Sequence, residues 1–276
     1  MSPLRSGIEP ALLGVAVAGY LVAWVTYWRA WRSRQEALGR RATMITWVAW
    51  IAQVAAFGAR AVAVGHLPIY SAYEFTAAFA GSVVLALLLV ERWSSRRDLG
   101  VALPPVALGI LAYAWAQPQT VEPLIPIFRG IWLKVHVLTA VVAYASFAGT
   151  AAACALSLVA RARDSAPDRV DPARLVTVGH RTAAVGFAFL TVSIASGAIW
   201  AEHVWGRFWS WDPKETWSLI TWLIYAAYLH ARTSTGWRGR KAAVLGIIGF
   251  LAVLMTYIGV DLVHPGQHDF LFWRRG

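Results

Sequence analysis

Seven histidines are the residues of this chain whose chemistry best suits a metal ion: His66, His136, His180, His203, His230, His264 and His268. Neutral imidazole is the commonest protein ligand of transition metals. The chain has one cysteine, Cys154, and it lies within an apolar run. A disulfide framework, a Cys-x-x-Cys redox pair and a cysteine-ligated cluster are therefore excluded within this chain. Imidazole is the ligand type that remains.

A second group of chemically distinctive residues lies between positions 200 and 217, where five tryptophans and one phenylalanine occur within 18 residues. Asp212 followed by Pro213 is typical of a helix N-cap, and Glu215 is correctly spaced to complete a capping box. A helix is predicted to begin there. The preceding tryptophans would form a rigid aromatic shelf, which suits a large, flat, apolar ligand with a polar edge. The alternative is an aromatic belt at the membrane surface, but a belt needs neither the Asp-Pro turn nor the Lys-Glu pair.

The composition indicates an all-α integral membrane protein that positions these residues at the ends of its helices. Of 276 residues, 58% are hydrophobic and 14% charged, with a mean hydropathy of +0.54, which excludes a soluble globular domain and a disordered chain. A spanning helix needs about 20 mostly apolar residues. Eight stretches meet or approach this length: 10–28, 44–64, 70–90, 99–116, 131–160, 182–200, 215–230 and 242–260. We expect one membrane domain over residues 1–276, with the tryptophan segment 200–217 as a loop within it.

The positive charges predict the orientation of these spans. Most of the 25 Lys and Arg residues follow the first, third, fifth and seventh spans, so the positive-inside rule places both termini outside. The net charge of +11 then needs no nucleic-acid partner. In this topology five histidines lie at or near the outer face, at the level of the tryptophan segment: His66, His136, His203, His264 and His268. His180 and His230 lie near the inner face.

The tryptophan segment resembles the WWD signature of membrane proteins that handle haem during cytochrome c maturation. The matching residues are Trp205, Gly206, Trp209, Trp211, Asp212, Lys214, Glu215 and Trp217. Segments 68–74, 132–136, 186–201, 223–232 and 256–268 resemble flanking parts of the same proteins, so the resemblance covers roughly residues 65–270. The type that the chain resembles is CcsA (ResC), a membrane subunit of the System II cytochrome c synthetase.

The resemblance implies roles for three histidines. His136 and His268 match the two outer axial ligands of haem b, and the WWD residues named above would line that site. His230 matches a ligand of a second, intramembrane haem site, with the other ligand expected from a partner chain and His180 as an internal substitute. The alternatives are a His136 hydrogen-bonded within the helix bundle and a His230 that snorkels to the interface. His264 does not align with the family ligand, and His66 and His203 receive no role.

The function implied by the resemblance is to bring haem from the inner side to the outer face and present it to the Cys-x-x-Cys-His motif of apocytochrome c. The expected partners are a CcsB (ResB) type membrane subunit, apocytochrome c and lipid, and the expected location is the bacterial cytoplasmic membrane rather than the plastid thylakoid. Haem lyase activity would belong to the complex, and no catalytic residue is assigned. One alternative is a CcmC-type protein that passes haem to a chaperone.

A second alternative class is an ion-coupled transporter, because Arg60 and Glu74 are ionisable residues within expected spans. They lie on consecutive helices, so an ion pair between them is sterically possible. Such a pair would be structural or would orient the haem propionates, for which Arg129, Arg207 and Lys214 are also candidates. The transporter gives no reason for the tryptophan pattern.

Overall fold

The computed structural model describes residues 3–94, 97–120, 124–162, 172–234, 236–237 and 239–263. These residues form helices and short connections, and no strand occurs among them, which confirms the all-α class. The chain divides into two compact units, which are described separately. Unit 1 comprises Met1–Leu124 with Ala166–Val170, and unit 2 comprises Ile125–Ser165 with Asp171–Gly276. The single membrane domain expected from the sequence stays a prediction.

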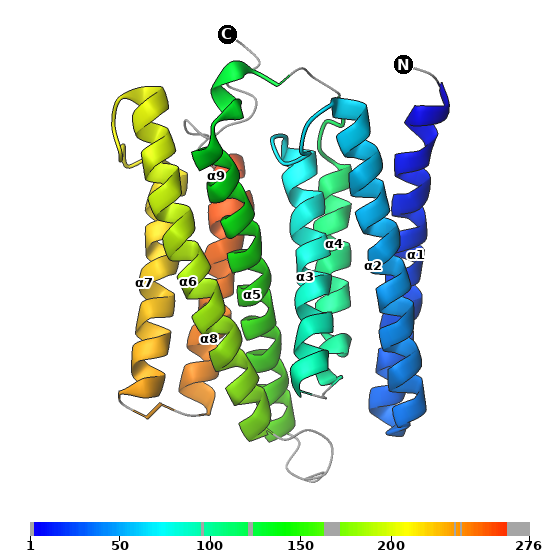
Figure 1. The fold of residues 1–276 in the computed structure, drawn as a ribbon. Coiled ribbons are helices and arrows are strands. Elements are labelled where there is room, and N and C mark those ends of the chain that lie inside the picture. The colour runs from blue at the N-terminus through cyan, green and yellow to red at the C-terminus, as the bar shows by residue number, and fades with distance from the viewer. Residues whose placement is uncertain are drawn as a thin grey trace. The chain divides into compact units, whose positions relative to one another are not determined.

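Unit 1 contains four long helices. They are α1 (Pro3–Ser33), α2 (Glu36–Val64), α3 (Ala72–Ser94) and α4 (Leu103–Trp115), the last preceded by a 3-10 turn at Asp98–Val101. Helix α1 packs along α2, and α3 packs along α4 (Figure 1). The paired prolines at the start of α4 occupy its first turn, where the missing N–H groups have no intrahelical partner to lose.

Unit 2 is built around α5 (Ile131–Ala162), which packs against α6 (Pro172–Trp205) and α8 (Arg240–Leu254). Helix α7 (Pro213–Thr233) packs against α6 and α8. A π-helical turn at Met255–Gly259 joins α8 to the short α9 (Val260–Val263), and a 3-10 turn at Pro126–Arg129 precedes α5. Consecutive helices run antiparallel (Figure 1). The end of α6, the start of α7 and the start of α5 therefore lie at one end of unit 2, which we call the tryptophan end.

Each of the eight stretches expected to span the membrane is largely helical. By length and composition, seven helices among the described residues can cross a membrane, and α7 is the expected span that is not included. Its 21 residues would reach about 31 Å at 1.5 Å per residue, enough for a bilayer core. Its charged and hydroxyl residues lower its hydropathy, so α7 crosses only if neighbouring helices shield those groups.

Helix α6 differs most from its expected bounds of 182–200. It begins ten residues earlier, at Pro172, and ends at Trp205, a length of 34 residues. The arginines before position 182 led to the expectation of a loop, but arginine is a good helix former. At its other end the helix continues past Trp200 to Trp205. The irregular part of the tryptophan segment is therefore shorter than 200–217 and begins at Gly206.

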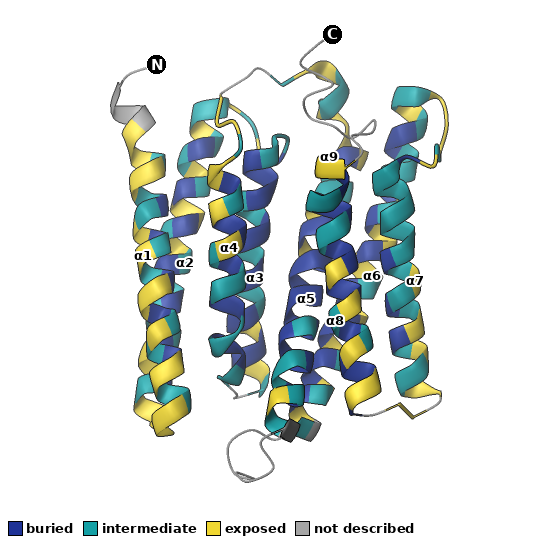
Figure 2. Ribbon diagram, turned by 180° about the vertical axis from the view of Figure 1, so that it is seen from behind, coloured by how far each residue is buried: buried dark blue, intermediate teal, exposed yellow. Residues whose placement is uncertain are grey.

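Individual helices differ in how completely their neighbours cover them. In α5, 78% of the most apolar window is buried, compared with 22% in α1 and in α2, whose faces are largely exposed (Figure 2). In unit 2, Phe147 of α5 stacks on Tyr225 of α7, with ring centroids 3.6 Å apart. The apolar residues on the exposed faces of α1 and α2 are consistent with contact with lipid or with another membrane chain.

Candidate functional site

The start of α7 is fixed by the capping box that the sequence predicts. The Asp212 carboxylate accepts a hydrogen bond from the Lys214 backbone N–H at 2.9 Å. The Glu215 carboxylate accepts from the backbone N–H groups of Ser210 and Asp212, at 2.8 and 3.2 Å. Two acidic side chains thus hold the segment before α7 against the first turn of the helix, where negative charge also favours the helix dipole.

The connection between α6 and α7 is short and constrained at both ends. Gly206 ends α6 in the left-handed region, with φ of +69°, and its N–H donates to the Glu202 carbonyl at 2.9 Å. Trp211 is also left-handed, with φ of +59°, and is 69% exposed. A bulky residue in this region is strained by roughly 1–3 kcal/mol, and such strain concentrates at functional positions. The backbone therefore holds the Trp211 ring in an exposed position next to the cap.

The tryptophan rings form two edge-to-face pairs. Trp200 and Trp205 have centroids 5.2 Å apart and ring planes at 75°, and Trp209 and Trp211 have centroids 5.8 Å apart and planes at 88°. Trp217 lies within the first turns of α7 and is half-buried. Because neighbouring rings stand nearly perpendicular, the segment offers separate ring faces and edges in place of one continuous flat shelf.

His136 lies in the second turn of α5 at the same end of unit 2 (Figure 1). Its Nδ1 lies 2.8 Å from the Ser193 carbonyl oxygen of α6, and the Ser193 hydroxyl donates to the His136 carbonyl at 3.0 Å. A carbonyl oxygen can only accept, so Nδ1 carries the proton and the lone pair of the ring is on Nε2. This tautomer is the one in which histidine ligates a metal through Nε2 while a backbone group fixes the ring.

The face of α6 that contacts His136 also carries a tryptophan, Trp200. Ser193, Gly197 and Trp200 follow one another at helical spacing, so they lie on one stripe of α6. A Cβ atom added at Gly197 would lie 2.6 Å from His136 Nδ1, so only glycine permits this approach. The Trp200 indole N–H donates to the Ile127 carbonyl at 3.4 Å. The same stripe therefore carries the residues that contact the His136 imidazole and, one turn further on, the buried Trp200.

Lys214 is held by the C-terminal part of unit 2. Its Nζ lies 2.7 Å from a carboxylate oxygen of Asp261, just after the π-helical turn, and both side chains are largely buried. The ion pair connects the first turn of α7 to the residue from which the chain continues toward His264 and His268. Those two histidines lie outside the described residues. His268 is seven positions after Asp261, a reach of at most about 25 Å when fully extended.

His180 and His230 lie at the opposite end of unit 2, as expected. His230 is in the last turn of α7 and exposed, with Nδ1 3.4 Å from the Ser234 hydroxyl. His180, in the third turn of α6, is half-buried. Helices α5 and α7 run in the same direction, and His136 is near the start of α5 whereas His230 is near the end of α7, so the two histidines belong to separate sites.

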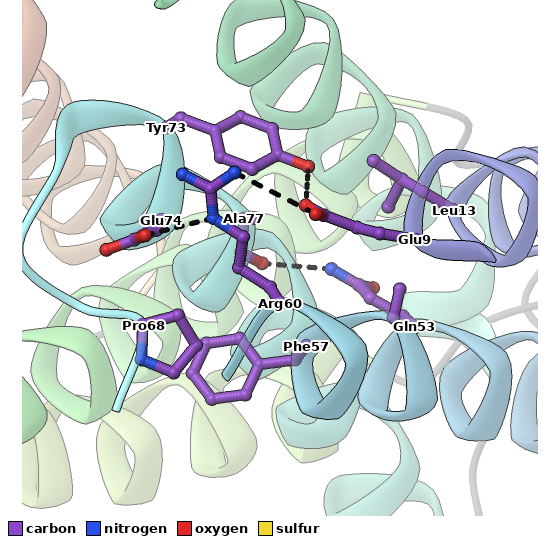
Figure 3. A pocket seen from close by; sticks show the side chains of 10 residues that line it. Glu9, Leu13, Gln53, Phe57, Arg60, Pro68, Tyr73, Glu74 and Ala77 are labelled. Atoms are coloured by element: carbon purple, nitrogen blue, oxygen red, sulfur yellow. Dashed lines mark hydrogen bonds and ion pairs between the residues drawn. The ribbon is translucent and has the colours of Figure 1, made fainter. Parts of the chain in front are cut away.

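The expected ion pair between Arg60 and Glu74 exists in unit 1, with Arg60 Nε 3.0 Å from the carboxylate (Figure 3). The remaining guanidinium nitrogens donate to the carbonyls of Gln119 and Thr120, at 2.9 and 3.0 Å. The two residues line a pocket of about 310 Å³, partly open, together with Glu9 of α1. Since its donors are already bound, Arg60 serves best as a structural junction of α2, α3 and the segment after α4.

The other candidates have local partners. His66 is half-buried and its Nδ1 contacts the neighbouring Leu67 carbonyl. His203 is exposed and lies 3.6 Å from the Glu202 carboxylate. Among the described part of the chain, no cluster of three or more His, Cys, Asp or Glu residues could hold a metal ion alone.

Sequence reasoning missed three residues that shape this end of unit 2: Ser193, Gly197 and Asp261. The spacing of Ser193, Gly197 and Trp200 was a usable signal, because a small residue between a hydroxyl residue and a tryptophan marks a close helix contact. Asp261 gave no comparable signal, since its distance from Lys214 in sequence hides the pairing.

The fold and this site define an all-α, multi-pass membrane protein with a rigidly capped, tryptophan-rich segment beside a tautomer-fixed histidine. Residues 69–268 match the family described as Cytochrome C assembly protein. The cytochrome c biogenesis protein CcsA of Rippkaea orientalis is 34% identical, the alignment covering 77% of this chain and 82% of the relative. CcsA of Parasynechococcus marenigrum is 39% identical, with 75% and 78% covered.

The solved structure of the Cytochrome c Heme Lyase CcmF has the same fold, with a TM-score of 0.69 at 18% identity. The match covers 93% of this chain and 47% of CcmF, so the chain spans about half of that protein's length. The chain belongs to the cytochrome c assembly protein family and is of the CcsA type. Its role lies in cytochrome c biogenesis.

Proposed function

We propose that this protein is the membrane subunit of a cytochrome c synthetase that binds haem b at the tryptophan end of unit 2 and presents it to apocytochrome c. The observation that carries the proposal is the hydrogen bond from His136 Nδ1 to the Ser193 carbonyl, at 2.8 Å. It selects the tautomer whose Nε2 can bind iron, at the end of the unit that carries the WWD residues.

The residues at the tryptophan end of unit 2 suit a substrate with a flat apolar ring system and two carboxylates. The exposed ring of Trp211 and the half-buried ring of Trp209 offer apolar contact. Arg207 is exposed on the same connection and carries a positive charge suited to a propionate. Lys214 is committed to Asp261, so we assign it to the support of this site and Arg207 to the propionates. The remaining WWD residues, Trp205, Gly206, Asp212, Glu215 and Trp217, shape and hold the segment.

His268 is proposed as the second axial ligand. The Lys214–Asp261 ion pair supports this assignment because it fixes Asp261, which precedes His268 in the chain, beside the first turn of α7. His136 lies on a packed helix and its ring is held by the Ser193 carbonyl. We therefore assign His136 as the fixed ligand and propose His268 as the ligand that the histidine of the Cys-x-x-Cys-His motif replaces.

The chain contributes positioning to the attachment reaction. Each thiol of apocytochrome c adds across one haem vinyl group: an S–C bond forms, and the thiol hydrogen ends on the neighbouring vinyl carbon. No oxidant or reductant is consumed in the addition. Holding the ring system at one end leaves its vinyl edge accessible, and such orientation can supply several kcal/mol of the barrier reduction.

His230 is proposed as a ligand of a second haem on the way to the outer site. Its exposure on α7 supports a ligand pair completed by another chain, which we infer to be a CcsB (ResB) type subunit. The arginine distribution favours an orientation with the tryptophan end outside, and we propose the bacterial cytoplasmic membrane as the location. Haem would then enter near His230 and reach the outer face at His136.

Co-expression with the partner subunit and an apocytochrome c tests this proposal in cells that lack other maturation systems. Covalent haem attachment is read from haem-stained gels of the cytochrome. We expect attachment with the wild-type chain and at least about a tenfold loss with His136→Ala, the scale of losing a ligand. Exposed His203→Ala is the matched control and should leave attachment unchanged. Full attachment with His136→Ala would overturn the proposal.

A further inference from the structure

The helix that α8 continues into contains a π-helical turn at Met255–Gly259. The Val260 N–H donates to the Met255 carbonyl, five residues earlier, whereas an α-helix uses the carbonyl four residues earlier. A Cβ atom at Gly259 would overlap the Met255 sulfur, so the turn places the methionine side chain over a residue that has none. Turns of this kind are rare and frequently lie at functional sites. This one directly precedes Asp261, the ion-pair partner of Lys214.

Contacts between α7 and α8 show which side of the helix faces α7 where the π-helical turn begins. A Cβ atom at Gly249 would lie 2.7 Å from the Tyr225 ring, and the buried hydroxyls of Thr221 and Thr256 are 3.2 Å apart. Thr256 therefore points toward α7. Lys214 is seven residues before Thr221, and seven residues complete two α-helical turns to within about 20°. Lys214 and Thr221 thus lie on one stripe of α7.

The extra residue of the π-helical turn decides which side chain reaches Lys214. Successive residues of an α-helix are about 100° apart, so a residue five positions after Thr256 would point about 140° away from it. Asp261 would then face away from α7, and Val260 and Val263 would face it. The π-helical turn takes up one additional residue, which brings Asp261 back to within about 40° of Thr256. The Asp261 carboxylate accordingly lies 2.7 Å from Lys214 Nζ.

A carboxylate matters at this position because the side chain of Lys214 is only 15% accessible and that of Asp261 only 26%. Losing one partner of a largely buried ion pair is strongly destabilising. The nearby carboxylates of Asp212 and Glu215 already accept backbone N–H groups of the capping box. A regular α-helix after α8 would therefore separate the first turn of α7 from the segment that leads to His268.

We propose that the π-helical turn is a positioning element of the haem site and that Thr256 sets its direction. The inference rests on the proposed function, in which the segment after Asp261 carries the ligand His268. The turn rotates Asp261 onto Lys214, and this ion pair holds the start of the segment beside the first turn of α7. The residues of the turn act on the haem only through Asp261.

Insertion of one alanine after Ile258 tests the rotation in the full chain purified with its partner subunit. The insertion should turn Asp261 about 100° away from Lys214. Haem retention, read as Soret absorbance per chain, should fall at least about tenfold, the scale of losing a group that orients a metal ligand. Adding Val260→Asp to the insertion puts a carboxylate where Asp261 was and should restore most of the retention.

An alanine inserted after Val263 is the matched control for this variant. It lengthens the same segment by one residue but leaves the π-helical turn and Asp261 in place, so retention should change less than about twofold. Unchanged retention after the insertion at Ile258, or an equal loss with the control insertion, would overturn the proposal. A loss that Val260→Asp does not restore would also overturn it, because rotation would then not be the cause.

The absorption spectrum separates lost positioning from a general loss of structure. In the variant with alanine after Ile258, the iron should keep His136 and lose His268. Added imidazole should therefore restore the α and β bands of the wild type. Bands that imidazole does not restore in a chain with a normal unfolding transition would contradict a role through His268.

Substitutions at Thr256 decide the question if the insertion prevents folding. Thr256→Val removes the hydroxyl contact with Thr221 and should lower haem retention about threefold, the scale of one hydrogen bond between membrane helices. Thr256→Ser keeps the hydroxyl and should retain haem as the wild type does. Equal retention in the two variants would contradict Thr256 as the residue that sets the direction of the turn.

The rotation can also be measured without haem. In the wild type, Lys214→Gln and Asp261→Asn should lower the unfolding temperature non-additively, because both remove one contact. In the variant with alanine after Ile258, the two substitutions should act independently. Coupling that persists there would contradict the rotation. A wild-type chain with this coupling but without haem would contradict the proposed function and leave the rotation standing.

Discussion

Gly197 of α6 lies against the imidazole ring of His136 of α5, so closely that a Cβ atom at position 197 would sit 2.6 Å from Nδ1 and 2.9 Å from Cε1. The glycine allows the Ser193 carbonyl, one turn earlier, to accept the Nδ1 proton. Fixing the ring therefore depends on the absence of a side chain one helical turn away.

Replacing Gly197 with alanine should move the His136 ring and loosen the Ser193 hydrogen bond. Losing the outer group that orients a metal-binding histidine typically costs 10- to 100-fold in affinity, so we expect haem retention to fall about tenfold or more. Gly109→Ala in α4 is the control, because no atom lies within 4 Å of its added Cβ. Titration of the purified complex with haem measures both. Unchanged haem affinity in Gly197→Ala would contradict the role of this contact.

Breaking the Lys214–Asp261 ion pair should release the C-terminal segment from the start of α7. Lys214→Gln and Asp261→Asn should each weaken haem retention, and the double variant should be no weaker than the worse single variant, since both remove the same contact. The comparison is made on Soret absorbance per chain at several haem concentrations. Additive losses would show that the two side chains act independently.

Removing one partner of the buried Arg60–Glu74 pair should destabilise unit 1. Arg60→Gln leaves a carboxylate buried without its cation, which typically costs about 3–5 kcal/mol. The control is Arg40→Gln, which breaks an exposed pair with Glu36 whose side chains are 57% and 73% accessible and should cost under about 0.5 kcal/mol. Unfolding in detergent with increasing denaturant measures the difference. Equal midpoints for the two variants would contradict a buried structural pair.

The capping box at Asp212 should contribute to the stability of α7. Asp212→Ala removes the acceptor for the Lys214 N–H and should cost about 0.5–2 kcal/mol. Asp212→Asn keeps an acceptor oxygen and should cost less. Hydrogen exchange of the first turn of α7 reports the effect locally. Protection that is identical in the alanine variant and the wild type would show that Pro213 alone fixes the helix start.

The helices, the start of α7 and the Arg60–Glu74 pair could be predicted because each has a local signal. Apolar stretches about 20 residues long define the spans, and Asp212, Pro213 and Glu215 lie within one turn. Arg60 and Glu74 face each other because their helices are consecutive. The extension of α6 back to Pro172 was not predicted, because the arginines of that region were attributed to a loop.

Contacts between helices distant in sequence could not be predicted. Ser193 and His136 are 57 residues apart, and Lys214 and Asp261 are 47 residues apart. Their pairing depends on which faces of α5, α6, α7 and α9 meet, and a single sequence does not contain that information. The perpendicular tryptophan pairs were missed for a related reason, since ring orientation is set by packing and by the left-handed backbone of Trp211.

The most direct test of the account is the absorption spectrum of the purified complex in the wild type and in His136→Gly. We predict a Soret band and sharp reduced α and β bands in the wild type, loss of most of this absorbance in the variant, and its recovery when imidazole is added to occupy the vacated position. A wild-type preparation from haem-replete cells without a Soret band, or a His136→Gly spectrum identical to the wild type, would contradict haem binding at this histidine.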